Sequence, residues 1–568
     1  MSKLQLLQRA RTVRDLADLL ELKPSSLTYL LYKLPDVNKY TQFSVPKASG
    51  GTRAILSPCD SLKAAQRKLK ILIEDCIHEL EPRTVDSNFS HGFKRNLSIV
   101  TNASVHRNKR YVFNTDLTDF FPSIHFGRVR GYFMKNRNFD LSTEIATMIA
   151  QLACHAGSLP QGSPSSPIVS NLVAHILDIR LASLAAKNRC SYSRYADDIT
   201  FSTNEREFPK DIAVLVPNEA HQWEVGVQLS DVIVRSFFAI NPIKTRMQYQ
   251  DSRQSVTGLV VNKTCNASIQ YRRLARAKAD TLFRSGAFHH LVKPATGAVT
   301  QVPGKISELL GIFSYLFMID QARRNVPKTP VGKYHEREFS SMDKVHRDLL
   351  FYTKFYATDR PTIICEGKTD YIYLHYAIRR LAADFPALVD SSNTAQLKPR
   401  VNFIRSTRKI DYLLDCTNGS SNMARFIREY GDRCKRFECP RSDFPVIILV
   451  DNDDGADKVF AAVKHSSVPP LKADVTGDKP YYYVTKNLYV VPVPKLAGGS
   501  KAAIEDLFTT DTLATLVNGK QFSRAKTINP LTEYGKQVFA EQVIKKQWPN
   551  IEFDGFKPLL ETTVLLTN

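Results

Sequence analysis

Residues 191–202 read SYSRYADDITFS, with two adjacent aspartates, Asp197 and Asp198, in the middle of the stretch. The residues on both sides are mostly aromatic, β-branched or small, which predicts two strands joined as a hairpin at the acids. Like charges at a hairpin tip repel each other and destabilise the fold unless a cation neutralises them. A solvated turn is the structural alternative, but the placement at a hairpin tip favours a metal site.

A second acidic stretch, VFNTDLTDFFPSI, covers residues 112–124. Asp116 follows a strand-like run there, and Asp119 comes three residues later as an expected structural or capping acid. Mg²⁺ prefers carboxylate oxygens that separate rigid elements offer together with substrate phosphates. Asp116 on one strand and Asp197 and Asp198 on a neighbouring hairpin therefore predict a two-metal phosphoryl-transfer site.

The charge of the chain predicts a polyanionic partner. The 568 residues carry a net charge of +22, with 43% hydrophobic and 24% charged residues, and the length predicts two to four domains. Residues 361–568 hold 28 basic and 24 acidic residues, so the first 360 hold the other 50 and 32. An excess spread over several hundred residues predicts nucleic-acid binding by that region.

The cysteines and the apolar runs indicate a cytoplasmic protein. Nine cysteines are scattered without a CxxC pair, so neither a zinc site nor a disulfide framework is expected. No apolar run is expected to reach the roughly 18–20 residues of a membrane span, and the charged N-terminal segment lacks the apolar core of a signal peptide. We therefore expect no membrane partner.

Five regions are expected from the sequence patterns. They are a helical segment (1–36), mixed strands and helices (37–260), basic helices (261–322), a linker rich in proline, glycine and charge (323–360), and a region of alternating strands and helices (361–568). The second region predicts an α+β domain. Buried apolar strands in the last predict an α/β domain with a parallel sheet.

Acids also follow the predicted strands of the last region. TIICEGKTD places Glu366 at a strand end and Asp370 one helical turn later, and VIILVDNDDG places Asp451 and Asp453 after a second strand. Ligands bind at the carboxyl ends of such strands, and Glu505 in AAIEDLF stands near a third element. A solvated acidic turn is the alternative for DNDDG.

Several stretches between about residues 40 and 320 resemble, in order and spacing, the reverse transcriptases. DLTDFFPSI, LPQGSPSSPIVSNL and YADD are similar to the palm motifs, FSVPKASGGTR to the fingers motif, and NPIKT to the lysine motif that follows. The resemblance implies a right-hand polymerase with fingers, palm and thumb. It also implies two Mg²⁺ ions held by Asp116, Asp197 and Asp198.

The same resemblance implies roles for single residues. Lys47 and Arg53 would bind the incoming triphosphate, or alternatively template phosphates. Phe121 would be the steric gate against a ribose 2′-OH, with core packing as the alternative. Gln161 would lie under the nascent base pair, and Lys244 would donate a proton to the pyrophosphate leaving group.

Two further stretches resemble the bacterial retron reverse transcriptases, which use them to engage their own structured RNA. SIVTNASVH carries Asn102 and His106, and VTG comprises Val256, Thr257 and Gly258. A structural histidine is the alternative at position 106. The resemblance implies an enzyme that uses dNTPs to reverse-transcribe part of a non-coding RNA into msDNA, joined to the RNA through a 2′,5′ branch at a guanosine.

The Glu-Gly and Asp-x-Asp strand ends resemble the TOPRIM fold over roughly residues 360–510. The positions of Glu366, Asp370 and Glu505 are similar to those in OLD-type nucleases. With Asp451 and Asp453, they imply one or two Mg²⁺ or Mn²⁺ ions and hydrolysis of a nucleic acid, with Glu366, Asp451 and Asp453 catalytic. The resemblance further implies an antiphage effector restrained by its RNA–DNA hybrid, for which self-association is expected.

Two other functions stay open. A group II intron-like or other reverse transcriptase would share the polymerase residues, although no maturase region or zinc-bearing endonuclease is recognised. A non-catalytic scaffold for RNA and DNA is the second alternative. Clustered carboxylates would oppose polyanion binding in such a scaffold, so they favour catalysis.

Overall fold

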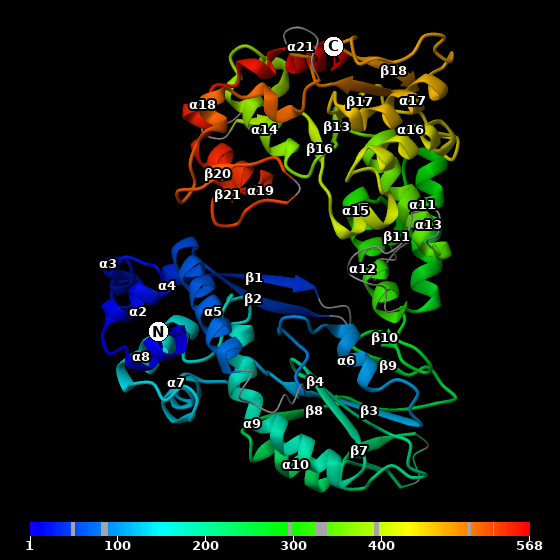
Figure 1. The fold of residues 1–568 in the computed structure, drawn as a ribbon. Coiled ribbons are helices and arrows are strands. Elements are labelled where there is room, and N and C mark those ends of the chain that lie inside the picture. Colours follow the sequence, from blue (N-terminus) through cyan, green and yellow to red (C-terminus); the bar gives the residue numbers. More distant parts are fainter. Residues whose placement is uncertain are drawn as a thin grey trace. The chain divides into compact units, whose positions relative to one another are not determined.

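The computed structural model describes residues 1–46, 51–80, 89–217, 219, 221–292, 298–324, 338–390, 397–496, 501–525 and 527–567. The chain forms two compact units (Figure 1). Unit 1 comprises Met1–Ser268 and unit 2 comprises Ile269–Asn568. The division falls just before the first of the basic helices that the sequence predicts.

Unit 1 begins with short helices at the positions where helical spacing predicts them. These are α1 (Lys3–Arg9), α2 (Val13–Leu19), α3 (Pro24–Thr28), η1 (Tyr29–Lys33) and α4 (Asp36–Lys39). The hydroxyls of Ser2 and Thr12 cap α1 and α2 by accepting hydrogen bonds from backbone amides. Each cap of this kind stabilises its helix by about 1 kcal/mol. Leucines on the inner faces join the core of unit 1.

An antiparallel hairpin of β1 (Tyr40–Pro46) and β2 (Thr52–Pro58) follows. The amide of Leu56 on β2 donates to the carbonyl of Gln161 at 2.8 Å. Gly162 has φ +128°, and a Cβ at this position would lie 2.5 Å from the Leu56 carbonyl oxygen. Only glycine allows this approach, so the hairpin predicted as the fingers is tied to the loop that carries Gln161.

A four-stranded antiparallel sheet forms the centre of unit 1. Its order is β4 (Ser191–Tyr195), β5 (Asp198–Thr203), β3 (Tyr111–Thr118) and β8 (Ala239–Tyr249). The helices of the same unit are α5 (Asp60–Leu80), α6 (Ile99–Val105), α7 (Phe126–Lys135), α8 (Thr143–Ala153), α9 (Ser166–Lys187) and α10 (Val227–Val234). Side chains of the sheet and of most of these helices form one continuous core.

α9 has the length and hydropathy of a membrane span, and it is the one such helix in the described ranges. The expectation that no stretch reaches this length is therefore corrected. In its most apolar 18-residue window, 56% of the residues are buried inside the protein. Its Asp178 also forms a buried ion pair with Arg194, so α9 is packed as a core helix of unit 1.

Unit 2 contains a five-stranded sheet. Its order is β16 (Asn402–Ile404), β13 (Thr362–Cys365), β17 (Val446–Val450), β19 (Leu488–Pro492) and β18 (Tyr482–Thr485). The first four strands are parallel and β18 is antiparallel. Every residue of β13 and β17 is buried, which is why both appear in the sequence as continuous apolar runs. The parallel sheet predicted for this region is present.

Helices and a C-terminal extension complete the α/β part of unit 2. The helices are α14 (Asp370–Arg380), α15 (Arg408–Leu413), α16 (Ser420–Cys434) and α17 (Asp457–Ser466). The extension contains η7 (Ile504–Leu507), α18 (Thr510–Leu513), β20 (Gln521–Phe522), β21 (Glu533–Tyr534), α19 (Lys536–Val538), η8 (Phe539–Ile544) and α21 (Lys557–Thr567). Aromatic side chains of the extension join the same core as β13, β17 and α14.

The two helices predicted as a thumb belong to unit 2. α11 (Ile269–Ser285) and α12 (Ile306–Arg324) are joined by a hairpin of β11 (His289–Val292) and β12 (Thr300–Pro303). The segment expected as a linker, 323–360, contains α13 (Ser341–Phe351) and η4 (Tyr352–Tyr356), with many buried side chains. This part of the expected linker is therefore folded into unit 2.

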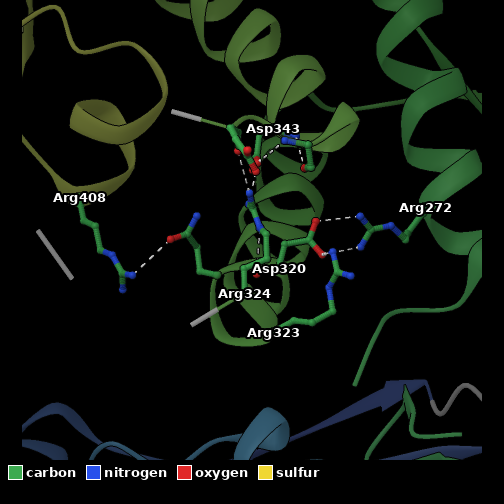
Figure 2. Close-up of polar contacts among 9 residues, drawn as sticks. Arg272, Asp320, Arg323, Arg324, Asp343 and Arg408 are labelled. Atoms are coloured by element: carbon green, nitrogen blue, oxygen red, sulfur yellow. Dashed lines mark hydrogen bonds and ion pairs between the residues drawn. The ribbon is translucent and has the colours of Figure 1, made fainter. Parts of the chain in front are cut away.

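Two buried aspartates hold α11, α12 and α13 together (Figure 2). Asp320 on α12 accepts hydrogen bonds from both terminal nitrogens of Arg272 on α11 at 2.9 and 2.8 Å. Asp343 on α13 accepts a hydrogen bond from Arg324 on α12 at 2.6 Å. The two carboxylates are only 1% and 2% exposed, so each depends on its arginine for neutralisation.

Asp320→Asn is expected to lower the free energy of unfolding of unit 2 by about 3 kcal/mol, because Arg272 is left without its buried counter-ion. Urea unfolding of the full chain measures the effect. Asp280→Asn is the matched control, since Asp280 on α11 is 38% exposed and pairs with Arg284 and Arg436. The control should cost about 0–1 kcal/mol. Equal losses in both variants would contradict the role of the buried pair.

Candidate active sites

Asp116, Asp197 and Asp198 lie together at one end of the central sheet of unit 1. Asp198 begins β5 and lies directly opposite Asp116 on β3. The amide of Leu117 donates to the carbonyl of Asp197 at 3.0 Å, which places the turn beside the same strand. The hairpin and the upstream acid predicted from the sequence therefore meet in the structure.

Positive charge compensates the acids of this site only in part. Burial and repulsion from neighbouring carboxylates raise the pKa of Asp197, and they raise the pKa of Asp198 to about 6. Lys244 on β8 lies with Nζ 2.8 Å from Asp116 Oδ2, and this hydrogen bond raises the pKa of the lysine. The positive charge of Arg53 on β2 opposes the shift at Asp197. A cationic ligand would relieve the remaining repulsion.

The donors of the site fit Mg²⁺ in kind and in charge. Carboxylate oxygens are hard ligands of the type that Mg²⁺ prefers. Within the described ranges, no three carboxylate, imidazole or thiol groups are already arranged to hold a metal ion. The side chains would therefore have to draw closer around a bound cation.

A buried ion pair beneath the turn holds the acids in place. Arg194 is fully buried, with Nε and Nη2 each 2.7 Å from an oxygen of Asp178 on α9. Its Nη1 donates to the carbonyl of Ala196 at 2.8 Å, and Ala196 has φ +56° immediately before the acids. The sequence analysis assigns Arg194 no role, although a charged residue within an otherwise uncharged strand was an available signal.

The predicted nucleotide-binding residues differ in their surroundings. Lys47 lies outside the described residues. Phe121 is half-buried, with its ring centroid 5.4 Å from that of Phe120 and 6.3 Å from that of Phe93, so aromatic packing accounts for part of its placement. Gln161 is half-buried on the loop that is tied to β2. The roles of these side chains stay predictions.

Asn102 and His106 are buried at the end of α6, being 1% and 0% exposed. The two ring nitrogens of His106 lie 2.7 Å from the hydroxyls of Ser202 and Ser193, and Asn102 accepts a hydrogen bond from Ser193 at 2.7 Å. Burial lowers the pKa of His106 to about 3. These contacts support the β4–β5 hairpin from inside and favour the structural alternative, and an RNA contact by Asn102 and His106 stays a prediction.

The VTG stretch forms the tight turn between β9 (Ser255–Val256) and β10 (Leu259–Val260). Val256 is buried, whereas Thr257 and Gly258 form the turn with φ +46° and +81°. The Thr257 hydroxyl donates to the carbonyl of Ile99 on α6 at 3.1 Å. A β-branched residue rarely adopts positive φ, so the surrounding contacts hold Thr257 in a strained conformation.

A second acidic centre lies at the carboxyl ends of β13 and β17 in unit 2. Glu366 and Asp451 directly follow these paired strands, and the amide of Asp451 donates to Glu366 Oε2 at 3.3 Å. Asp370 begins α14 and is buried. Asp451 Oδ1 accepts a hydrogen bond from the amide of Ile504 at 2.8 Å, which brings the turn that carries Glu505 beside it.

Burial and mutual repulsion raise the pKa values of these acids. The pKa rises to about 7 for Glu366 and for Asp451, and to about 6 for Asp370. Loss of hydration is the largest cause in each case. The main repelling carboxylate is Asp451 for Glu366, Asp370 for Asp451, and Glu505 for Asp370. Such crowding is typical of sites that bind a cation.

Asp453 has different surroundings from the other predicted ligands of unit 2. Its side chain is exposed and accepts a hydrogen bond from the amide of Gly455 at 2.7 Å, which caps η6 (Asp454–Ala456). It is close enough to Glu366 to contribute to the raised pKa of that group. A solvated acidic turn, the alternative that the sequence leaves open for DNDDG, accounts for this hydrogen bond. The role of Asp453 as a metal ligand stays a prediction.

Lys536 of the C-terminal extension lies among these carboxylates. Its Nζ is 2.9 Å from Oε1 and 3.1 Å from Oε2 of Glu505, whose side chain is fully buried. Burial disfavours the charged lysine, but Glu505, Asp451 and Asp370 outweigh it and raise the pKa of Lys536. The sequence analysis misses this residue, because a lone lysine 31 positions from its partner carries no local signal.

Comparisons with known proteins bear on the first unit. Residues 45–261 match the family model of reverse transcriptase (RNA-dependent DNA polymerase). The chain is 32% identical over 329 residues to the retron Mx162 reverse transcriptase of Myxococcus xanthus, covering 54% of this chain and 64% of that protein. It is 33% identical over 284 residues to the retron Mx65 reverse transcriptase of the same organism, covering 47% and 62%.

A third relative is the retron Ec86 reverse transcriptase of Escherichia coli, 28% identical over 281 residues, with 47% of this chain and 78% of that protein covered. The chain therefore spans just under two thirds of the length of the two Myxococcus relatives. Among solved structures, apo telomerase from Candida tropicalis has a TM-score of 0.27 and 12% identity over 42% of this chain and 56% of that chain, too little to bear on the fold.

Glu366→Gln is expected to raise the melting temperature of unit 2 at pH 8 in EDTA, because it removes one of the repelling carboxylates. Because the pKa of Glu366 is raised, its charged form lowers the free energy of unfolding. This penalty is complete above about pH 7, and it disappears as the pH falls towards 4.5, the ordinary pKa of a glutamate. Differential scanning fluorimetry of the full chain across this range measures the effect. The half-buried Glu541, which pairs with Lys545 away from the centre, provides the control variant Glu541→Gln. A gain that does not depend on pH would contradict the proposed repulsion.

Proposed function

We propose that this chain is a retron reverse transcriptase, an RNA-directed DNA polymerase that copies part of a structured non-coding RNA into branched, RNA-linked msDNA. The convergence of Asp116, Asp197 and Asp198 within the segment 45–261 carries the proposal. The similarity to retron reverse transcriptases of Myxococcus xanthus and Escherichia coli supports the substrate class. Bacterial cytoplasm is the corresponding proposed location.

The chemistry follows from the three aspartates and the cations beside them. Two Mg²⁺ bound by Asp116, Asp197 and Asp198 would activate the attacking hydroxyl and stabilise the charge that develops on the phosphoryl group. Arg53, whose charge acts on Asp197, would bind the triphosphate of the dNTP. Lys244 lies beside the site, with its Nζ 2.8 Å from Asp116, and is proposed to donate a proton to the leaving pyrophosphate.

The remaining residues predicted for this site are proposed to contact the incoming nucleotide or the nucleic acid. Lys47 is proposed to bind triphosphate with Arg53, Phe121 to exclude a ribose 2′-OH, and Gln161 to lie under the nascent base pair. The turn at Thr257 and Gly258 is proposed to contact the non-coding RNA. Its strained backbone and its hydrogen bond to α6 support a fixed presentation of this turn.

The double variant Asp197→Asn/Asp198→Asn is expected to lose at least about a thousandfold of RNA-templated primer extension, because the site loses two of its three carboxylates. Asp119→Asn is the matched control. Asp119 is exposed at φ +46°, a conformation that asparagine tolerates. Extension at the wild-type level by the double variant would overturn the assignment. Sequencing of co-purified nucleic acid separates a branched RNA–DNA from intron RNA and from an unmodified RNA bound by a scaffold.

We further propose that unit 2 contains a TOPRIM-like nuclease that acts as an antiphage effector, with a nucleic acid as its substrate and homo-oligomerisation as a means of restraint. The placement of Glu366 and Asp451 at the ends of two adjacent parallel strands supports it. The raised pKa values there indicate a shortage of positive charge that one or two Mg²⁺ or Mn²⁺ would satisfy. Asp370, Glu505 and Asp453 are the further proposed ligands.

Asp451→Asn is expected to abolish divalent-dependent cleavage of DNA or RNA and to leave primer extension unchanged, because Asp451 belongs to unit 2 alone. Asp474→Asn is the control, since Asp474 is an exposed acid paired with Lys464. Cleavage of labelled DNA, messenger RNA and transfer RNA in Mn²⁺ identifies the substrate. Undiminished cleavage by Asp451→Asn would contradict the assignment of the site.

A further inference from the structure

The acidic centre of unit 2 already contains a cation that belongs to the protein. Lys536 places its Nζ within 3.1 Å of both carboxylate oxygens of Glu505, a side chain with no exposed surface. The lysine comes from the C-terminal extension, whereas Glu366, Asp370 and Asp451 come from β13, α14 and β17. The C-terminal extension therefore supplies the cation of a cluster whose acids lie at the ends of β13 and β17 and at the start of α14.

Packing fixes this segment next to α14. Phe539, three residues after Lys536, is fully buried and stacks on Phe522 with ring centroids 4.4 Å apart. It also contacts Tyr373 at 5.9 Å. Tyr373 stands three residues after Asp370 on α14, and the charge of Asp370 contributes to the raised pKa of Lys536, so the two side chains lie near each other.

The ammonium leaves one acceptor of Glu505 incompletely satisfied. Although Nζ lies 2.9 Å from Oε1, this buried oxygen receives no hydrogen bond of satisfactory direction. A buried carboxylate oxygen that accepts no hydrogen bond has lost its bound water, and no protein group replaces that water. Glu505 therefore retains an oxygen that can bind a second ligand.

We infer that Lys536 is a built-in counter-ion that keeps divalent cations out of this acidic centre until the lysine is withdrawn. The inference rests on the proposed metal-dependent function of unit 2. Lys536 and a metal ion would compete for the same oxygens of Glu505, and the positive charges of the ammonium and the metal ion would repel each other when both contact one carboxylate. The lysine side chain is 41% exposed, so it can swing into solvent without unfolding the extension.

Withdrawal of Lys536 provides a physical form of restraint for the proposed nuclease. With the ammonium in place, the buried acids have a partial counter-charge, and the centre is stable without metal. Rotation of the Lys536 side chain into solvent would remove this charge and leave Glu366, Asp370, Asp451 and Glu505 to a divalent cation. The C-terminal extension thus controls when the centre accepts its metal.

The full-length Asp197→Asn/Asp198→Asn protein, in which the polymerase site is disabled, is suited to the test. Lysine labelling by an N-hydroxysuccinimide ester, read by mass spectrometry, is compared with and without Mn²⁺. Labelling of Lys536 is expected to be slow without Mn²⁺ and several-fold faster with it. Lys545, an exposed lysine paired with Glu541 in the same extension, should not change. Unchanged labelling of Lys536 while Mn²⁺ binds would overturn the inference.

Calorimetric titration with Mn²⁺ provides the second measurement. In the same background, Lys536→Met is expected to bind Mn²⁺ at least about tenfold more tightly, since a competing unit charge is removed. Lys545→Met should bind like its parent, and equal affinity in the two variants would overturn the inference. The labelling experiment needs no substitution at Lys536, so it decides the question even if Lys536→Met fails to fold.

The same titration separates this inference from the proposed nuclease. Adding Glu366→Gln and Asp451→Asn to the background removes two of the proposed ligands. If the added substitutions leave Mn²⁺ binding unchanged, the proposed metal site fails, and the inference fails with it. If they abolish binding but Lys536→Met has no effect on affinity, the metal site stands and the role of Lys536 alone is wrong.

Discussion

Repulsion between carboxylates is the constraint on which both candidate sites depend. Asp116, Asp197 and Asp198 gather at the end of one sheet, and Glu366, Asp370 and Asp451 gather at the end of another. Asp116 and Asp370 are buried and Asp197, Glu366 and Asp451 are half-buried, so water screens their charges only in part. The raised pKa values of most of these acids record the cost. A fold that keeps such groups together must supply cations, from its own side chains or from solution.

The protein supplies one ammonium to each centre. Lys244 pairs with Asp116 and Lys536 pairs with Glu505, and in both pairs the carboxylate is buried while the lysine remains partly exposed. A partly exposed lysine on a flexible stem can return to water, provided that a ligand takes its place beside the buried carboxylate. Arginine has a different use in unit 1, where the fully buried Arg194 forms a two-point pair with Asp178 and cannot move without exposing an unpaired charge. The two lysines thus occupy positions where a ligand can replace them. The arginine occupies a position where the geometry must stay fixed.

The division into two units changes how the parts of the chain are related. The basic helices α11 and α12 belong to the same unit as the α/β sheet, and the pair of Arg272 with Asp320 ties them to each other. Asp343 extends this connection to α13. The acidic centre at Glu366 and Asp451 therefore lies in the same unit as these two helices.

The amino-acid sequence by itself predicted which acids come together in each unit. Asp116, Asp198, Glu366 and Asp451 all stand at strand ends or at a hairpin, and strand patterns and acidic residues are local features. The sequence also predicted an α+β domain over residues 37–260 and a parallel sheet in residues 361–568, the latter because buried parallel strands appear as continuous apolar runs.

Only the tertiary structure decided which cationic side chains pair with the buried acids. Arg194 and Lys536 find Asp178 and Glu505 across chain separations of 16 and 31 residues, and such pairings depend on how distant elements pack. Burial is likewise a property of the whole fold, which is why the sequence does not show that His106 lies inside unit 1. Local patterns determine where charge is placed along the chain. The packing of distant elements determines which charges lose their water, and therefore which must be paired.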